Sequence, residues 1–458
     1  MRKGPQQWNS FVHRNSTVPI AALLLVLAAA CEASSPSLAP AAVEVEFGPH
    51  EITLSLSPNE IADGPVKSRP MSLEWGFRSV EIEALGSIAD IRLHGDQGLV
   101  IADWMSPQIL LLHGPGSSPE RIVGRGPGPG ETGLLYSVLS TGSHIVGWGA
   151  SSSRAFQVFQ EDGTPRATVP IPVPGDWTFV LFRRPPVPWE PHQMTAEYTS
   201  ERLARLDAEH FIHILQDDER RKDSAGMGVP IEDLWTSAIL YDLDGQVQDT
   251  LARYPAPRTR YAEGHHGLPV QDMYAGRLRI SGSDHHLAAT HGDSAYVRII
   301  PRNSTPGPDR WIRWRSFRPP LGADAVQHQV DLAFDLAFAS DPEFVRMWRQ
   351  ESRARQRREL SDYFDELNHI PEAAPEVTKL WSDGTCVFLA GFRYTDSYDG
   401  TSSTIIGINL ADDTHEVLTV SQPRFRIRDM HRGRVLVTTR EDDDTWGVHV
   451  YRHGMSCH

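Results

Sequence analysis

The chain has 458 residues, of which 59 are acidic and 44 are Lys or Arg, and its formal net charge is −15. A chain of this length provides for one large domain or two ordinary ones. The acidic balance argues against a nucleic-acid partner, whose phosphates are bound by Lys and Arg, and against a protein that lies flat on anionic lipid.

The first 30 residues have the pattern of an export signal. Arg2, Lys3 and Arg14 make the start basic, and an uncharged, largely apolar run follows over residues 18–30. This run is shorter than the roughly 20 apolar residues that a membrane-spanning helix needs. We therefore predict a signal peptide over residues 1–30.

A single cysteine, Cys31, directly follows the small residues Ala28-Ala-Ala30. This arrangement resembles the lipobox of bacterial lipoproteins. The resemblance implies that Cys31 becomes the first residue of the mature protein and carries acyl chains, and two or three chains anchor a protein stably where one does not. Glu32 follows in place of Asp, which by analogy with enterobacterial sorting favours the outer membrane or cell surface of a bacterial envelope. The open alternative is an ordinary signal cleaved after Ala30 or Ala33.

After the signal, residues 31–42 are small, Pro-containing and without periodicity, which predicts a flexible tether. Short apolar runs separated by turns then continue to the end of the chain. The stretch Ile88–Val123 holds four such runs within about 40 residues, the length of one propeller blade. Because the pattern repeats, we predict an all-β, six-bladed β-propeller over residues 43–458.

The last unit has three strand-like runs, so its fourth strand must come from elsewhere. We expect it from Val43–Phe47 or from Ser79–Ile82, near the start of the mature chain. Closure by strands from both chain ends leaves no exposed sheet edge in the ring.

One segment, at about residues 341–367, departs from the β pattern. Pro342 suits the first turn of a helix, and apolar residues follow at helical spacing. The opposite face is rich in Arg. We predict one inserted helix here, whose basic face is either simply solvated or a docking face for an acidic partner.

The segment Gly124–Glu131 reads Gly-Arg-Gly-Pro-Gly-Pro-Gly-Glu. It is similar to the turn after the first blade in six-bladed β-propellers related to NHL-repeat propellers, a family that is common among bacterial lipoproteins. Ile370–Phe392 resembles the lead into a late blade of that family, and Arg434–Arg452 resembles its closing strands. The resemblance implies the propeller fold for most of residues 75–453. It implies no activity, since this fold carries many unrelated functions.

Two cysteines remain once Cys31 is assigned to lipid. Cys386 and Cys457 form an even pair in an oxidising compartment, which makes them a disulfide candidate. Two free, partly buried thiols are the alternative that the sequence leaves open.

The fourth unit concentrates side chains that bind metals, namely His285, His286, His291 and Asp293. Neutral imidazole and carboxylate groups suit zinc or a similar divalent ion. Neighbouring residues of a strand point to opposite faces, so at most one of His285 and His286 reaches the centre of the ring. Surface or hydrogen-bonded histidines are the alternative. We predict no cofactor and consider a divalent metal only at these positions.

Together these features predict a lipid-anchored envelope protein that binds a small molecule or another protein, with no nucleic-acid partner. We expect the insertions at 183–205 and 216–235 to present part of the binding surface. The alternative is a propeller enzyme, a metal-dependent lyase or hydrolase that uses His and Asp residues of the channel. No Gly-x-Ser-x-Gly nucleophile motif occurs. A purely structural envelope protein is a third hypothesis.

Overall fold

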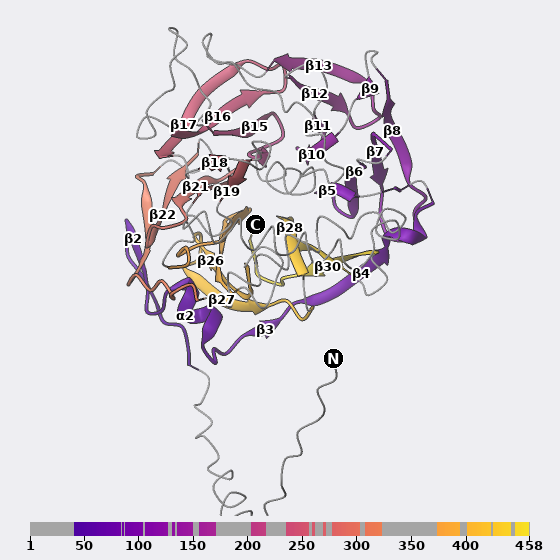
Figure 1. Ribbon diagram of the computed structural model, residues 1–458. Coiled ribbons are helices and arrows are strands. Elements are labelled where there is room, and N and C mark those ends of the chain that lie inside the picture. Colours follow the sequence, from indigo (N-terminus) through magenta and orange to yellow (C-terminus); the bar gives the residue numbers. More distant parts are fainter. Residues whose placement is uncertain are drawn as a thin grey trace, which may run out of the picture. The chain divides into compact units, whose positions relative to one another are not determined.

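The computed structural model describes the part of the chain that forms the propeller. The described residues are 41–83, 85–86, 88–103, 106–126, 131–132, 135–149, 155–170, 203–216, 235–255, 259–261, 269–271, 277–302, 307–322, 373–393, 401–422, 425–440 and 445–457. Within them, six four-stranded antiparallel blades stand around a central axis (Figure 1). The protein is an all-β, six-bladed β-propeller, as the sequence predicts.

Blades 1 to 3 follow one another along the chain, and each begins with its innermost strand. Blade 1 comprises β5 (Ile88–His94), β6 (Gly98–Asp103), β7 (Gln108–Leu112) and β8 (Glu120–Arg125), with β9 (Glu131–Thr132) parallel to β8. Blade 2 comprises β10 (Leu135–Ser140), β11 (His144–Gly149), β12 (Ala155–Gln160) and β13 (Pro165–Pro170). Blade 3 comprises β14 (Leu203–Arg205), β15 (His210–Gln216), β16 (Trp235–Asp242) and β17 (Val247–Pro255). A separate hairpin of β18 (Thr259–Tyr261) and β19 (Pro269–Gln271) follows.

Blades 4 to 6 each include strands from the N-terminal segment, which extend blades 4 and 5 and supply the fourth strand of blade 6. Blade 4 comprises β20 (Leu278–Gly282), β21 (His286–His291), β22 (Tyr296–Pro301) and β23 (Arg310–Trp314), extended by β2 (Glu51–Leu54) and β1 (Val45–Phe47). Blade 5 comprises β24 (Lys379–Asp383), β25 (Cys386–Phe392), β26 (Thr401–Asn409) and β27 (Thr414–Thr419), extended by β3 (Arg69–Pro70). Blade 6 comprises β28 (Phe425–His431), β29 (Arg434–Arg440), β30 (Trp446–Arg452) and β4 (Ser72–Arg78).

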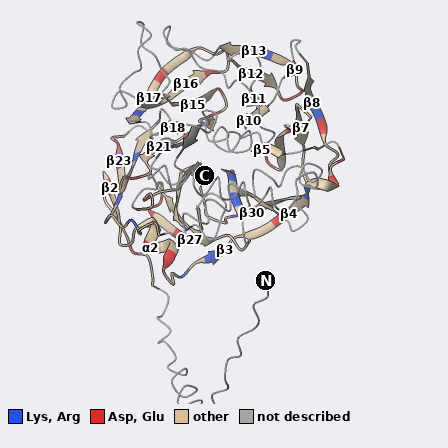
Figure 2. Cartoon of the chain, in the orientation of Figure 1, with Lys and Arg blue, Asp and Glu red and all other residues tan. Residues whose placement is uncertain are grey.

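The hydrophobic core is divided into six clusters, one between each pair of neighbouring blades. Ile91 of blade 1, for example, packs in one cluster with Leu436 and Val450 of blade 6. All residues of β6 and all residues of β25 are buried. These strands read as continuous apolar runs because neighbouring blades cover both of their faces. Basic and acidic residues are both found along the outer strands, such as β8 and β4 (Figure 2).

The ring is closed by β4, whose residues Ser72–Arg78 pair with β30. This corrects the sequence expectation, because Val45–Phe47 pairs with β2 on blade 4 and Ser79–Glu81 forms the short 3-10 helix η1. The reason is packing: β4 carries Trp75 and Phe77 against the cluster between blades 1 and 6. The principle of closure by the N-terminal segment is confirmed.

Residues 41–78, which we call the N-terminal belt, run along the outer edges of blades 4, 5 and 6. The belt includes α2 (Pro58–Asp63), which begins with a capping box between Ser57 and Glu60. Among the described residues α2 is the one α-helix, and the sequence did not predict it. The helix predicted at 341–367 lies outside the described residues.

Asn59 of α2 is fully buried and attaches the belt to the ring. Its Nδ2 donates to the carbonyl oxygens of Phe317 (2.9 Å) and Pro375 (3.0 Å), and its Oδ1 accepts from the backbone N–H of Phe392 (2.7 Å). A polar side chain in the core is stable here because its three hydrogen bonds satisfy it.

Candidate functional site: the central cavity

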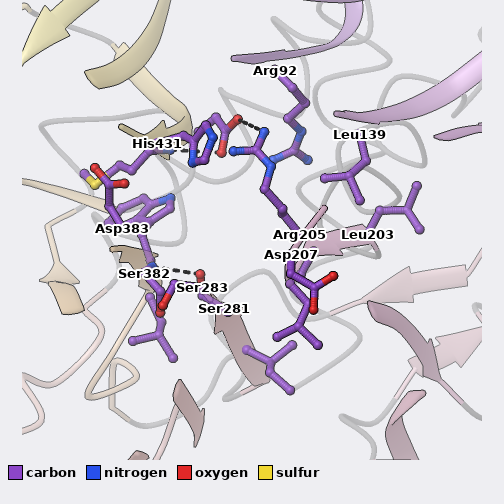
Figure 3. A pocket seen from close by; sticks show the side chains of 18 of the residues that line it. Arg92, Leu139, Leu203, Arg205, Asp207, Ser281, Ser283, Ser382, Asp383 and His431 are labelled. Atoms are coloured by element: carbon purple, nitrogen blue, oxygen red, sulfur yellow. Dashed lines mark hydrogen bonds and ion pairs between the residues drawn. The ribbon is translucent and has the colours of Figure 1, made fainter. Parts of the chain in front are cut away.

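A cavity of about 360 Å³ lies at the axis, where the innermost strands of the blades end. All six blades contribute to its lining, and Figure 3 shows side chains from several of them. One representative from each blade, in order from blade 1 to blade 6, is Arg92, Leu139, Arg205, Ser281, Asp383 and His431.

Side chains on the innermost strands tie each blade to the next around this cavity. The buried Asp90 of blade 1 accepts from Ser137 Oγ (2.9 Å) and from the backbone N–H of Val138 (3.1 Å) in blade 2. Asp429 of blade 6 accepts from the backbone N–H of Leu93 in blade 1 (3.0 Å). These acceptors satisfy backbone donors that would otherwise be buried without a partner, so the acidic groups near the axis have structural roles.

Blades 4, 5 and 6 are joined in the same way. Ser281 Oγ accepts from the backbone N–H of Ser382 (2.8 Å). Asp383 accepts from the backbone N–H groups of Arg432 and Gly433 (2.6 Å each), and its Oδ2 lies 3.1 Å from His453 Nε2. Burial acts to raise the pKa of Asp383, but the hydrogen bonds from His453 and Gly433 outweigh it and lower this pKa. Asp383 is therefore ionised and occupied by three donors.

Arg205 of blade 3 extends toward three other blades. Its Nε donates to the Ser140 carbonyl, and its Nη2 donates to the Leu93 carbonyl (3.0 Å) and lies 3.5 Å from Asp429 Oδ2. Burial is the largest influence on the pKa of Arg205 and lowers it, while Asp429 raises it and Arg92 lowers it further. A guanidinium stays protonated in proteins in spite of such shifts, so a fixed positive charge stands at the axis.

A second guanidinium, that of Arg92, lies next to Arg205 (Figure 3). Arg92 Nε is 3.2 Å from Asp90 Oδ2, and its Nη1 donates to the Arg428 carbonyl (2.7 Å). Counted over the whole lining, seven side chains are Lys or Arg and five are Asp. The cavity therefore has an excess of cationic side chains in a chain whose formal net charge is −15.

His431 of blade 6 faces the cavity as a neutral imidazole. Burial is the main cause that lowers its pKa to about 2, and the positive charges of Arg205, Arg432 and Arg434 add to the effect, against Asp383. In the described part of the chain, neither ring nitrogen of His431 has a hydrogen-bond partner. A neutral imidazole presents one donor and one acceptor.

Two further lining residues have unused hydrogen-bonding capacity. The Ser382 hydroxyl is buried and has no partner among the described residues. In the same part of the chain, nothing accepts a hydrogen bond from Nη1 of Arg205. Among the described residues, Arg205 Nη1 of blade 3 and the imidazole of His431 of blade 6 thus lie at one cavity without protein partners, whereas the Ser382 hydroxyl is enclosed by protein.

Of the residues that the sequence marked as metal ligands, the structure brings His291 and Asp293 together and places His286 at the other end of the same strand. His286 and His291 stand at opposite ends of β21. His286 is buried with its Nδ1 3.4 Å from Ser283 Oγ, and His291 stacks on Tyr254 and lies 4.0 Å from Asp293. His285 lines the cavity. Over the described ranges, no three His, Cys, Asp or Glu side chains are grouped to hold a metal ion.

Cys386 and Cys457, the candidate pair, are joined in the structure by a disulfide with a Cα–Cα distance of 5.2 Å. The bond holds the C-terminal segment against blade 5, and Cys457 itself lines the cavity. Gly384 is required at this contact. Its φ is +55°, and a Cβ there would lie 1.6 Å from the Cys457 carbonyl oxygen.

Several sequence predictions fall on residues that the structure does not describe. They are Cys31 with the signal peptide, most of the insertions at 183–205 and 216–235, and residues 127–130 of the Gly-Pro turn after blade 1. Sequence reasoning missed Arg92, Arg205 and His431. A signal was available in the sequence: each of these charged or imidazole side chains lies near the end of the first strand-like run of its blade, which is the strand closest to the axis.

Comparison with known proteins gives likenesses of fold only. No protein-family model and no curated protein matches the chain. A protein of Bacteroides fragilis NCTC 9343 described as exported matches with a TM-score of 0.38 and 10% identity, over 84% of this chain and 95% of that chain. A chain of the nidogen/laminin complex matches with a TM-score of 0.31 and 10% identity, over 73% of this chain and 81% of that chain. Streptogramin B lyase matches with a TM-score of 0.30 and 9% identity, over 83% of this chain and 88% of that chain. Such values say nothing of what this chain binds.

In the described residues, no helix is long and apolar enough to cross a membrane.

Proposed function

We propose that this protein binds a small polar molecule in its central cavity and works outside the cytoplasm, anchored by lipid at Cys31. The observation that supports binding is that Arg205 and His431, two lining side chains with hydrogen-bonding groups left unused by the described residues, share one cavity. A hydrogen bond contributes about 0.5–1.5 kcal/mol, and about 1.5–3 kcal/mol where one partner is charged. A ligand that pairs with these groups gains these contributions when it binds.

The size of the cavity favours a small molecule over a protein segment, which the sequence left open. Its volume of about 360 Å³ lies at the lower end of the range for small-molecule sites. The lining comes from strands and tight hairpins of all six blades rather than from long loops. A site on such elements is preorganised, so little conformational entropy is lost when it binds.

The lipid anchor is supported by the sequence alone, namely by the uncharged, largely apolar run over residues 18–30 that ends directly before Cys31. Residues 31–42, which are small and Pro-containing, suit a flexible tether between such an anchor and a folded domain.

Ligand binding is tested by thermal denaturation of the purified protein in the presence of a panel of small polar molecules, with a variant that blocks the cavity. Ala208 is exposed and lines the cavity, so Ala208→Trp fills space without disturbing the core. Val247→Trp, at an exposed position on β17, is the matched control. We expect a saturable rise in melting temperature that Ala208→Trp abolishes and Val247→Trp retains. Equal responses in both variants, or no saturable response, would contradict the proposal.

The anchor is tested by mass spectrometry of the N-terminal peptide from the mature protein and by fractionation of cells. We expect Cys31 at the N-terminus with acyl chains attached, and release of Cys31→Ser from the membrane fraction. An uncut precursor, or a mature protein cut at another position without lipid, would contradict it.

The alternative of a metal-dependent enzyme receives less support. It requires the predicted ligands to converge, and the structure places His286 and His291 at the two ends of one strand. We therefore do not propose it.

A further inference from the structure

We infer that the ligand of the central cavity is a small hydroxylated organic anion whose carboxylate or phosphate group is bound by Arg92 and Arg205. This inference rests on the proposed binding function of the same cavity and names its chemical class. It depends on how the two guanidinium groups are held and on what the remaining polar groups of the lining offer.

The first step concerns Arg205, which is fixed in place before any ligand arrives. Carbonyl groups of blades 1 and 2 and the carboxylate of blade 6 hold its Nε and Nη2. The remaining edge of the guanidinium, at Nη1, faces the cavity without a partner among the described residues. A planar guanidinium with a free edge matches the geometry of carboxylate and phosphate oxygens.

The second step concerns the neighbouring positive charge. Arg92 and Arg205 lie side by side, although like charges at close range repel in a site with little water (Figure 3). Of the nearby carboxylates, Asp90 pairs with Arg92 Nε (3.2 Å), but it also accepts from Ser137, Val138 and the backbone N–H of Ile91, so its charge is shared among several donors. An anionic group between the two guanidinium groups would reduce this repulsion, and a cationic ligand would increase it.

The third step concerns the rest of the ligand. His431 of blade 6 lines the same cavity and is uncharged. Its imidazole can pair with a hydroxyl group, since a neutral imidazole both donates and accepts. A molecule with one anionic group and several hydroxyl groups, such as a sugar acid or a sugar phosphate, satisfies both halves of the site.

Asp429 provides a test of the sign of the ligand's charge. Its carboxylate lies 3.5 Å from Arg205 Nη2 and competes with an anion for that cation. Asp429→Asn keeps one oxygen, which can accept from the backbone N–H of Leu93 and so retain the contact between blades, while the hydrogen bond from the backbone N–H of Met430 is lost. Removal of this negative charge should tighten the binding of an anion and should weaken the binding of a cation.

The experiment measures dissociation constants for three probes of similar size by titration calorimetry, namely glucuronate, glucose 6-phosphate and glucose. The first two separate a carboxylate ligand from a phosphate ligand, and glucose is the neutral reference. The proteins are the unaltered chain, Arg92→Gln, Asp429→Asn and, as the control, Arg166→Gln. Arg166 is an exposed residue of β13 that pairs with Asp244, and it does not line the cavity.

We expect at least one anionic probe to bind more tightly than glucose. Arg92→Gln should weaken this binding at least about tenfold, because a hydrogen bond to a charged group is worth about 1.5–3 kcal/mol. Asp429→Asn should tighten it, and Arg166→Gln should leave it unchanged. The melting temperature of each variant without ligand shows whether the ring is intact, and Asp429→Asn still reports the sign of the charge where Arg92→Gln fails to fold.

Three outcomes would overturn the inference. Binding of glucose as tight as that of both anions, with loss in Ala208→Trp, would retain the binding function but remove the anionic class. Weaker anion binding in Asp429→Asn than in the unaltered chain would also retain the binding function but remove the anionic class. Binding of none of the probes in the unaltered chain would also overturn the anionic class, while the wider panel with Ala208→Trp continues to decide the binding function separately.

Discussion

Arg205 Nη2 lies 3.5 Å from Asp429 Oδ2, although the two residues are 224 positions apart in the sequence and belong to blades 3 and 6. The pair spans the axis of the ring. Since Arg205 also donates to carbonyl groups of Leu93 and Ser140, one side chain connects four of the six blades. The same group thus stabilises the ring and supplies positive charge to the cavity.

The first prediction concerns the stability that this pair contributes. Arg205→Met should lower the free energy of unfolding by about 3–5 kcal/mol, because it leaves the Asp429 carboxylate and two carbonyl groups without their partner. In the background of Asp429→Asn the same substitution should cost less. The measurement is a double-mutant cycle by chemical denaturation. Additive effects of the two substitutions would show that the pair does not interact in solution.

The second prediction concerns the attachment of the N-terminal belt. Asn59→Ala removes three buried hydrogen bonds, so we expect a loss of roughly 3 kcal/mol in the free energy of unfolding. Limited proteolysis should then cut within residues 41–78 before it cuts the blades. Lys67→Ala, in the same belt at a position outside the core, is the control and should behave like the unaltered chain. Equal stability of the two variants would contradict the role of Asn59.

The third prediction concerns acid sensitivity. Burial, aided by the nearby His285, lowers the pKa of His286 to about 3 from an ordinary value of 6.5. Between pH 6.5 and about 3 the unfolded chain binds a proton at this position and the folded chain does not, so stability falls as the pH falls. At pH 5 this contribution amounts to about 2 kcal/mol relative to pH 7.

His286→Asn should therefore make the stability less dependent on pH over this range, whatever the substitution costs at pH 7. The measurement is the free energy of unfolding at pH 7 and pH 5 for each protein. His113→Asn, at an exposed position, is the control and should keep the full dependence. The same dependence in all three proteins would show that His286 is not buried as a neutral group.

The fourth prediction concerns the pair Cys386 and Cys457, which are 71 positions apart. A crosslink that closes a loop of this length contributes about 4 kcal/mol through the entropy of the unfolded chain. Reduction should therefore lower the stability of the unaltered chain and should not affect a variant with Cys386→Ala and Cys457→Ala. Peptide mapping without reductant should recover the linked peptides. Two free thiols in the protein purified from the envelope would contradict the bond.

The six-fold repetition of strands was predictable because each strand is indicated by a few consecutive residues. Strand runs such as Leu99–Asp103 and Cys386–Phe392 are continuous apolar segments bounded by turn residues, and each can be recognised without knowledge of its neighbours. Which N-terminal segment closes the ring was not predictable in this way. Val45–Phe47 and Ser72–Arg78 both have strand-like composition, and only packing against blade 6 selects the second.

Proximity in sequence and proximity in space differ for the histidines of blade 4. His286 and His291 are close along the chain, but an extended strand places them at opposite ends of β21. Arg92 and Arg205, on blades 1 and 3, are distant along the chain, but both strands end at the axis. The local composition suggested His286 and His291 as candidate ligands, whereas nothing in the sequence indicated that Arg92 and Arg205 lie close together.

The sequence by itself determined the class of fold, the number of blades and the use of the N-terminal segment to close the ring, because strand periodicity and turn residues act over a few positions. Only the tertiary structure decided that guanidinium groups from blades 1 and 3 and an imidazole from blade 6 share one cavity in an acidic protein. The physical reason is the closure of the ring, which brings the ends of six separate strands to one axis and removes their side chains from water.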